Sequence, residues 1–349
     1  MKDEKKIKTV FVVDDSDISL SLAKRALESH YRVLTMPSAV KMFMLFEKII
    51  PDLILMDIEM EEINGIETFQ QLKTSGKFSQ IPVIFLTGRN DIEIETKCFE
   101  MGAVDFITKP FSEPVLQNRV KTYLNIDEII HERTAQLYRL QSGIVSALAD
   151  IVENRDRAMD GHIERTTAYI RILIEAMKER GVYADIIKTW DTERVVLSAR
   201  LHDMGKIAIS DTILNKQDKL TDEEFEIIKA HAGEGVKIIE RMVEQTGEAD
   251  FLRNAKLFAG YHHEHWDGTG YPGRLKGTDI PLQGRIMAIA DVFDALVSSR
   301  SYKEAFTNED AVNTIAVNAG KQFDPKLVEV FLDVQDQIIK AKESLESIQ

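Results

Sequence analysis

The sequence is poor in cysteine and in long apolar runs. Its 349 residues include one cysteine, Cys98, which excludes an internal disulfide and fits a reducing compartment. No uninterrupted apolar run approaches the roughly 20 residues that span a bilayer. The short apolar stretch behind the basic first residues runs into paired aspartates, unlike a signal peptide. We therefore expect a soluble, cytoplasmic protein with no membrane partner, in which Cys98 is a buried apolar side chain.

Positive charge is also scarce. The chain has 44 Lys and Arg against 58 Asp and Glu, for a formal net charge of −14. This balance argues against a protein that coats nucleic acid, because phosphate binding relies on accumulated Lys and Arg. An anionic substrate must therefore meet local positive charge, which bound metal ions would supply. The length is sufficient for two domains, each with its own core.

The N-terminal third alternates short apolar runs with helical periodicity. The runs are "TVFVVDD", "YRVLTM", "DLILMD", "IPVIFLT" and "DFITKP", and residues 18–28 are one of the helical stretches between them. This βα alternation predicts a doubly wound, flavodoxin-like α/β fold with five parallel strands. In such a sheet, functional residues gather at the carboxyl ends of the strands.

Polar residues occupy those predicted strand ends: Asp14, Asp15, Asp57, Thr87 and Lys109. Three adjacent carboxylates repel one another unless a divalent cation lies between them, and a lysine with a hydroxyl suits a bound phosphoryl oxygen. The set predicts a magnesium-dependent phosphoryl acceptor. The alternative is that these aspartates are only solvated residues at strand ends.

Residues 8 to 125 resemble the receiver domain of two-component response regulators. The resemblance implies that Asp57 accepts a phosphoryl group from a cognate histidine kinase. It also implies a magnesium and phosphate site made of Asp14, Asp15, Thr87 and Lys109. We take residues 1–125 as this domain.

A heptad pattern follows the receiver-like region. The apolar positions recur every seven residues at Leu116, Tyr123, Ile130, Leu137, Ile144 and Ile151, and a second seam contains Ile126, Leu140 and Ala147. Such a repeat predicts a long helix that pairs with a copy of itself, although Arg133 interrupts the seam. We expect a homodimer through a linker over residues 126–147. A structural helix that folds back onto either domain is the alternative.

From about residue 141 the pattern is helical, which predicts an all-α domain over residues 148–349. Thr221 and Glu224 form a capping box ahead of an apolar stripe. Five segments then contribute seven side chains with ligand potential. They are His162, His202, Asp203, His231, His262, His263 and Asp291.

The number and chemistry of these seven groups predict two metal ions. A lone histidine on a helix face is more often a core residue than a ligand. Neutral imidazole and carboxylate suit Fe, Mn, Zn or Ni, and seven groups exceed the four that close a structural zinc site. The carboxylate of Asp203, directly after His202, has two oxygens that could bridge neighbouring ions. A pair of ions about 4 Å apart can bind a phosphodiester and activate a hydroxide for in-line attack.

Residues 140 to 340 resemble the HD-GYP branch of the HD metal-dependent phosphohydrolases, which degrade cyclic di-GMP. The matching motifs are "HDMGK" and "HHEHWDGTGYP". The resemblance implies that the seven side chains bind two divalent metals, iron or manganese, with Asp203 as the bridge. It implies substrate-phosphate contacts for Lys206, Arg300 and Lys303. It also places Gly270, Tyr271 and Pro272 beside the guanine pocket.

Two details refine this interpretation. Gly268, Gly270 and Gly273 match the spacing G-x-G-x-x-G, but a helical segment precedes them and Pro272 interrupts them, so we expect a substrate loop and no dinucleotide fold. Some HD-GYP proteins have a glutamate four residues before the first ligand histidine and bind a third metal there. This chain has Ala158 at that position. We therefore expect a dinuclear site and linear pGpG as the main product, in preference to GMP.

The two resemblances together suggest a response regulator that hydrolyses cyclic di-GMP when Asp57 is phosphorylated. Two other functions remain open on sequence grounds. One is a non-catalytic adaptor that binds cyclic di-GMP or a partner protein. The other is a phosphohydrolase of another cyclic dinucleotide or of a nucleotide phosphate.

Overall fold

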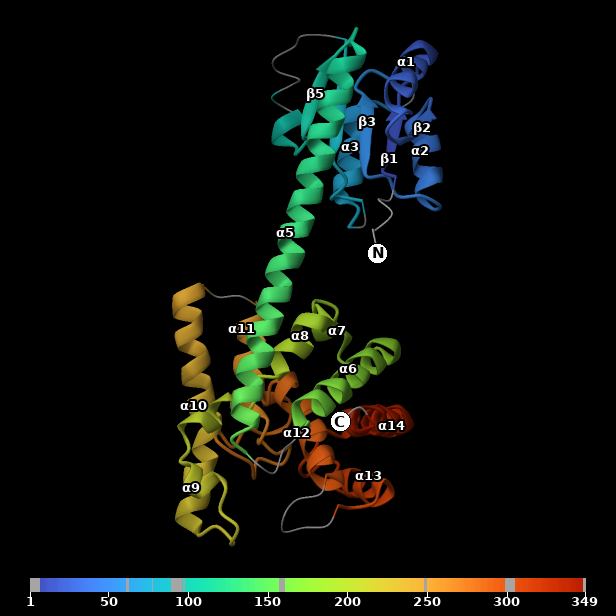
Figure 1. The fold of residues 1–349 in the computed structure, drawn as a ribbon. Helices are drawn as coiled ribbons and strands as arrows, with labels where there is room; N and C mark the ends of the chain where they lie inside the picture. Colours follow the sequence, from blue (N-terminus) through green and yellow to red (C-terminus); the bar gives the residue numbers. More distant parts are fainter. Residues whose placement is uncertain are drawn as a thin grey trace. The chain divides into compact units, whose positions relative to one another are not determined.

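The computed structural model describes most of the chain. The described residues are 7–60, 63–76, 78–88, 96, 98–156, 161–247, 250–298 and 305–347, with the side chains at positions 127 and 131 excepted. They fall into two compact units, Met1–Leu137 and Tyr138–Gln349 (Figure 1). Each unit is described by itself below.

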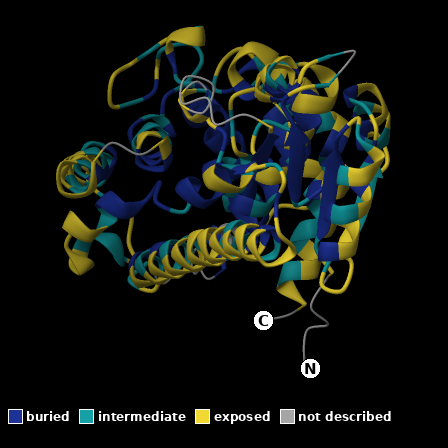
Figure 2. Cartoon of the chain, turned by 90° about the horizontal axis from the view of Figure 1, so that it is seen from above, coloured by how far each residue is buried: buried dark blue, intermediate teal, exposed yellow. Residues whose placement is uncertain are grey.

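The first unit contains a five-stranded parallel sheet. Its strands are β1 (Thr9–Val13), β2 (Arg32–Met36), β3 (Leu53–Asp57), β4 (Val83–Thr87) and β5 (Asp105–Thr108), in the order β2-β1-β3-β4-β5. Every residue of β1, β3 and β4 is buried, and Figure 2 shows these strands in dark blue. Both faces of a parallel sheet are covered by helices, which explains why the strands are continuous apolar runs. The predicted α/β fold is confirmed.

Alternate residues of the strands pack against different helices. Val10 and Val12 belong to a core with α1 (Asp17–Leu27) and the start of α5, whereas Phe11 and Val13 belong to a core with α2 (Ala39–Phe46) and α3 (Gly65–Thr74). This division follows from the two-residue period of a strand. Cys98 is buried in the second of these cores, as predicted.

Helix α5 spans Glu113–Glu153, which is 41 residues. Its first turns bury Leu116 and Val120 in the first unit, and its last turns bury Val145 and Val152 in the second. The predicted linker, residues 126–147, lies inside this helix. The heptad positions Leu116 and Tyr123 pack in the first unit, whereas the later ones, from Ile130 to Ile151, are exposed, with Leu137 at 67%. This helix therefore has an apolar seam that its own chain leaves exposed over the described residues.

The second unit is helical. Its elements are α6 (His162–Arg180), α7 (Ala184–Ile187), α8 (Thr192–Ala199), η1 (Met204–Ala208), α9 (Asp211–Leu214), α10 (Asp222–Thr246), α11 (Asp250–Tyr261), η2 (Gly277–Asp279), α12 (Leu282–Val297), α13 (Asn308–Val317) and α14 (Pro325–Glu346). Among its described residues no strand occurs, only an isolated bridge between Ala319 and Phe323. The predicted capping box of Thr221 and Glu224 starts α10. The all-α prediction is confirmed.

Two apolar cores hold these helices. One joins α6, α12 and α14 around Tyr169, Phe293 and Phe331, and the other joins the end of α5 to α8, α10 and α11. All described helices are too short or too polar to cross a bilayer. Helices of these two cores bear or adjoin the histidines and aspartates of the candidate site.

Candidate functional site

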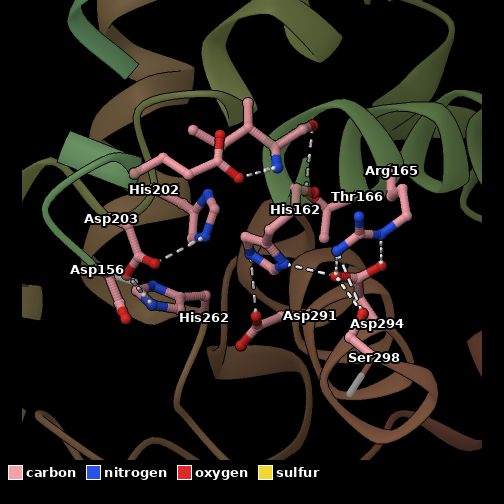
Figure 3. A network of polar contacts seen from close by, with 12 residues as sticks. Asp156, His162, Arg165, Thr166, His202, Asp203, His262, Asp291, Asp294 and Ser298 are labelled. Carbon is pink, nitrogen blue, oxygen red and sulfur yellow. Dashed lines mark hydrogen bonds and ion pairs between the residues drawn. The ribbon is translucent and has the colours of Figure 1, made fainter. Parts of the chain in front are cut away.

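The seven predicted ligand side chains come from five places in the second unit. His162 is the first residue of α6, His202 and Asp203 lie between α8 and η1, His231 lies within α10, His262 and His263 follow α11, and Asp291 lies within α12. Figure 3 shows His162, His202, Asp203, His262 and Asp291 directed toward a common centre. The fold thus brings together side chains that are far apart in the sequence.

Ligand atoms gather in two clusters. His162, His202 and Asp203 form one, His231, His262 and His263 form the other, and within each cluster one ligand atom per residue lies within 4.8 Å of the others. Asp291 adjoins the first cluster, since its Oδ1 is 3.4 Å from His162 Nε2.

Asp203 faces both clusters. Its Oδ2 is 3.3 Å from His202 Nε2. Its Oδ1 is 3.4 Å from His231 Nε2 and 3.8 Å from His262 Nε2. One carboxylate thus directs one oxygen to each group of imidazoles, which is the arrangement that a carboxylate bridging two ions requires.

The Nδ1 atoms of three imidazoles are each anchored by a backbone carbonyl oxygen. His202 Nδ1 lies 3.0 Å from Ala199 O, and His231 Nδ1 lies 2.6 Å from Ile228 O. His262 Nδ1 is 3.0 Å from Phe258 O. Because a carbonyl oxygen can only accept, each Nδ1 must carry a proton, so in the neutral imidazole Nε2 presents its lone pair. Metal-binding histidines are commonly oriented in this way.

These lone pairs meet in a buried space. His231 Nε2 and His262 Nε2 lie 3.2 Å apart, where two unprotonated nitrogens repel each other unless a cation lies near both. His162 Nε2 and His202 Nε2 are buried and make no hydrogen bond among the described residues, although carboxylates of Asp291 and Asp203 lie 3.4 and 3.3 Å away. A donor set of imidazole nitrogens and carboxylate oxygens fits divalent ions such as iron or manganese.

Burial keeps the second cluster neutral. It lowers the pKa of His231 and, together with the neighbouring histidines, lowers that of His262 well below its usual range. Burial lowers the pKa of His263 to about 4. Burial also opposes ionisation of Asp203, but Lys206 and His202 outweigh it and hold the pKa of that carboxyl well below its ordinary value. At neutral pH the three imidazoles and the carboxylate are therefore in the forms that bind metals.

Lys206 lies beside the bridge. Its Nζ is 2.8 Å from Asp203 Oδ2 and 3.0 Å from Asp156 Oδ2. Burial opposes its charge, but these two carboxylates raise the pKa of Lys206 above its ordinary value. The ammonium is thus fixed as a cation at the edge of the first cluster.

Asp294 is a residue that sequence reasoning missed. Its Oδ2 accepts from His162 Nδ1 at 2.8 Å, and its two oxygens accept from Arg165 Nε at 2.7 Å and Nη2 at 2.9 Å. Tyr169 donates to the same carboxylate at 3.2 Å. His162 and Arg165 hold the pKa of Asp294 below its ordinary value, against the effect of burial. Asp294 lies three residues after Asp291, so both face the same side of α12, and this spacing could have identified it from the sequence.

The glycine-rich loop adjoins the second cluster. The ring of Tyr271 lies 4.7 Å from that of His263, and burial raises the pKa of its phenol. Gly270 fits because a Cβ there would lie 2.3 Å from His265 N. Glu264, which the sequence analysis did not single out, is 2% exposed and accepts from Gly273 N and Leu275 N. The neighbouring Pro272 belongs to this loop. The loop follows α11, as the sequence predicted.

The remaining predicted positions in this unit differ in what the structure describes. Arg300, Lys303 and Ala158 lie outside the described residues. His265 lies outside both clusters, and its Nδ1 is 3.0 Å from Thr269 Oγ1.

Gly205 allows the segment after Asp203 to approach α10. A Cβ at this position would lie 1.8 Å from the carbonyl oxygen of His231 and 2.5 Å from Gly235 N. Only glycine fits such an approach. The glycine of "HDMGK" therefore permits the close contact between η1 and α10.

The first unit has a separate polar site at the carboxyl ends of its strands. Ligand atoms of Asp14, Asp15 and Asp57 lie within 4.8 Å of one another. Lys109 Nζ lies 2.6 Å from Asp14 Oδ2 and 2.7 Å from Asp57 Oδ2. Thr87 ends β4 and is buried, and its carbonyl accepts from Lys109 N at 2.7 Å.

Electrostatics couple the acids and the lysine of this site. Burial raises the pKa of Asp57, with Asp14 adding to the effect and Lys109 opposing it. Asp14 and Asp57 in turn raise the pKa of Lys109 against burial. A buried carboxylate beside two other acids and a cation can receive a divalent ion and a phosphoryl group.

Comparison with known families identifies both units. Residues 146–327 match the HD domain, and residues 10–121 match the response regulator receiver domain. The chain belongs to the HD-domain family. Its sheet-containing unit is a receiver domain, and its helical unit is an HD domain whose histidine and aspartate clusters are the candidate sites for divalent metal.

Several curated relatives are similar to this chain over most or part of its length. A "Probable cyclic di-GMP phosphodiesterase" of Vibrio cholerae serotype O1 is 37% identical over 346 residues, which cover 95% of this chain and 78% of that one. The "Cyclic di-GMP phosphodiesterase response regulator RpfG" of Xanthomonas campestris pv. campestris is 33% identical over 294 residues, 82% and 76% of the two chains. A Vibrio cholerae "3'3'-cGAMP-specific phosphodiesterase 2" is 41% identical over 202 residues, 58% of this chain and 36% of that one.

Proposed function

We propose that this response regulator hydrolyses cyclic di-GMP, mainly to linear pGpG, in its HD domain, and that phosphorylation of Asp57 controls the reaction. The observation that supports this most strongly is the carboxylate of Asp203, which directs one oxygen to each of two imidazole clusters. Two relatives whose alignments cover 95% and 82% of this chain are named as cyclic di-GMP phosphodiesterases.

Under this proposal, His162, His202 and Asp291 bind one ion, His231, His262 and His263 bind the other, and Asp203 contributes to both. When bound, two divalent ions, iron or manganese, supply a hydroxide at neutral pH and stabilise charge on the phosphate. The chain contributes a rigid ligand set, because the Nδ1 anchors fix the imidazoles before any ligand arrives.

The other side chains orient the substrate. Lys206 keeps its proton, since its pKa is raised by Asp203 and Asp156, and it is placed to orient a phosphate oxygen. Tyr271 also keeps its proton, because burial raises the pKa of its phenol. It borders the guanine base together with Gly270 and Pro272. By the family resemblance, we assign phosphate contacts to Arg300 and Lys303 as well.

An assay with the full-length protein tests this chemistry. The protein is loaded with Mn²⁺ or Fe²⁺ under anaerobic conditions, and cyclic di-GMP and its products are separated by chromatography. We expect pGpG to accumulate, and we expect Asp203→Asn to remove the activity, because its amide cannot serve as an anionic bridge. Equal rates for the two proteins would contradict the proposal.

Control by the receiver domain is tested separately. A histidine kinase would donate its phosphoryl group to Asp57, with Mg²⁺ held by Asp14 and Asp15. Beryllofluoride mimics the phosphoryl group, so we expect it to change the rate of the wild-type protein and to leave Asp57→Asn unaffected. The same rate with and without beryllofluoride in the wild type would remove the regulatory part of the proposal.

A second candidate substrate is another cyclic dinucleotide, because one relative is named as specific for 3'3'-cGAMP. A panel of cyclic dinucleotides at equal concentration distinguishes the two by kcat/KM. A protein that binds cyclic di-GMP but retains no metal would indicate an adaptor.

We also propose that a second copy pairs along α5. Ile130, Leu137, Ile144 and Ile151 share one heptad position and are 58%, 67%, 53% and 56% exposed. Burial of such a seam between two helices is the usual way in which a heptad repeat is stabilised. Sedimentation of the wild type is expected to give a dimer, and Leu137→Lys with Ile144→Lys is expected to give a monomer. A monomeric wild type would contradict this proposal.

A further inference from the structure

The chain turns sharply after α5, and the guanidinium of Arg155 reaches across to the segment that follows Asp203. Arg155 Nη1 donates to Ile207 O at 3.0 Å and to Lys206 O at 3.4 Å, and Nη2 donates to Ile209 O at 2.9 Å. The same group forms an ion pair with Asp211, with Nη2 2.7 Å from Oδ1. One side chain therefore contacts three backbone carbonyls and a carboxylate.

These carbonyls lie at the C-terminal end of η1, Met204–Ala208. Lys206 O also accepts from Ile209 N at 3.0 Å, and a cation placed at the last carbonyls of a helix stabilises them further. Asp203 is the residue directly before η1, and Lys206 lies inside it. The backbone that Arg155 contacts is therefore continuous with the proposed bridging carboxylate and the proposed phosphate-orienting lysine.

Asp156, the residue after Arg155, contacts η1 through the side chain of Lys206. Asp156 Oδ2 is 3.0 Å from Lys206 Nζ. The position of Arg155 is itself fixed, because Asn215 Nδ2 donates to its carbonyl oxygen at 2.8 Å. Residues 155 and 156 thus contact η1 through its backbone and through Lys206.

We propose that Arg155 is a positioning residue for the metal centre: by donating to the carbonyls of residues 206, 207 and 209, it fixes the orientation of Asp203 and Lys206. Arginine suits this role because its planar fork of five donors can serve several acceptors at once, whereas a lysine ammonium is a single point of charge. The effect on the reaction rests on the proposed function. The effect on metal binding does not.

The test uses the full chain and three variants: Arg155→Ala, Arg155→Lys and a control, Arg180→Ala. Arg180 also pairs with an aspartate at 2.7 Å, Asp333, but on the exposed end of α6. Metal-free protein is titrated with Co²⁺, whose visible absorption spectrum reports the ligand geometry, and with Mn²⁺ to obtain affinity. Steady-state rates with cyclic di-GMP are measured on the Mn²⁺ form.

For Arg155→Ala we expect a changed Co²⁺ spectrum and Mn²⁺ affinity lower by roughly 10-fold or more, as for loss of other outer partners of metal ligands. We expect kcat to fall by about 10-fold, with KM within about a factor of two. Arg155→Lys is expected to show smaller losses of Mn²⁺ affinity and kcat than Arg155→Ala, but not wild-type values. Arg180→Ala is expected to match the wild type.

A wild-type Co²⁺ spectrum and affinity in both Arg155 variants would overturn the inference. So would a variant that is only less heat-stable but whose folded fraction binds and turns over normally, since that outcome indicates a purely structural role. If Arg155→Ala does not fold, Arg155→Lys, which keeps the charge and the apolar stem, decides between the outcomes. If the wild type binds two ions but does not hydrolyse cyclic di-GMP, the proposed function fails while the Co²⁺ spectra still decide this inference.

Discussion

Replacement of Asp294 by asparagine would separate the charge of this carboxylate from its shape. Asp294 pairs with Arg165 through two hydrogen bonds of 2.7 and 2.9 Å and accepts from His162 Nδ1 at 2.8 Å. The two side chains of the ion pair are only 6% and 2% exposed. An asparagine keeps the volume and one acceptor oxygen but leaves the guanidinium without its counter-charge.

The expected loss of stability follows from that burial. Removal of one partner from a buried ion pair costs about 3–5 kcal/mol, because the other charge remains buried. Since asparagine can still accept one hydrogen bond, we expect a value near the lower end, about 3 kcal/mol. His162 would also lose an anionic partner on its Nδ1, so we expect Mn²⁺ affinity to fall by about 10- to 100-fold.

The assay is guanidinium chloride unfolding of metal-free protein, followed by tryptophan fluorescence. The chain has two tryptophans, Trp190 and Trp266, and both lie in the second unit. The signal therefore reports the HD domain without a contribution from the receiver. Mn²⁺ affinity is measured by calorimetry on the same preparations.

Asp333→Asn is the matched control. Asp333 pairs with Arg180 at 2.7 Å, but these side chains are 57% and 39% exposed. Exposed ion pairs contribute about 0–1 kcal/mol, so the control should lose less than about 1 kcal/mol and bind Mn²⁺ normally. Equal losses of stability in the two variants, or unchanged Mn²⁺ affinity in Asp294→Asn, would refute the reasoning.

Three further outcomes are expected. Gly205→Ala should destabilise the HD domain by about 1–3 kcal/mol or more, because its Cβ would meet the carbonyl of His231 at 1.8 Å. Gly233→Ala, inside α10 with nothing within 4 Å of its Cβ, should instead stabilise the HD domain by about 0.5–1 kcal/mol. If chemical unfolding shows that Gly233→Ala is less stable than Gly205→Ala, both predictions are wrong. Burial lowers the pKa of His202 but Asp203 outweighs it and raises that pKa above its ordinary value, so metal must displace a proton, and Mn²⁺ affinity should fall as the pH falls through the neutral range. Calorimetry of Mn²⁺ binding in buffers of different ionisation enthalpy should show that protons are released. An Mn²⁺ affinity that does not change with pH would contradict this prediction. Glu264→Gln should raise KM more than it lowers kcat, because Glu264 orders the loop through Gly273 N and Leu275 N; a loss confined to kcat would contradict that assignment.

The fold was predictable where local patterns determine it. The ends of the strands could be predicted because buried parallel strands are continuous apolar runs that stop at polar residues. The start of α10 was legible because Thr221 and Glu224 form a capping box whose two hydrogen bonds are local.

The candidate site was predictable only in part. The residues predicted as ligands come together, but the contacts of Asp294 and Arg155 that support them join residues far apart in the sequence, which no local pattern encodes. Asp294 is 132 residues from His162, and Arg155 is 52 residues from Ile207. A sequence shows that an aspartate or arginine is present, whereas only the packing of α5, α6 and α12 determines its partner.

The attachment of the glycine-rich loop to Glu264 has a consequence for divergence within this family. The candidate ligands of the ions lie on or beside helices that share two apolar cores, whereas the loop beside Tyr271 is tethered to a buried carboxylate through the amides of Gly273 and Leu275. Mutations that remodel this loop would leave the helical scaffold intact. Related enzymes can therefore differ in their specificity for the nucleobase while they retain the same metal-binding residues.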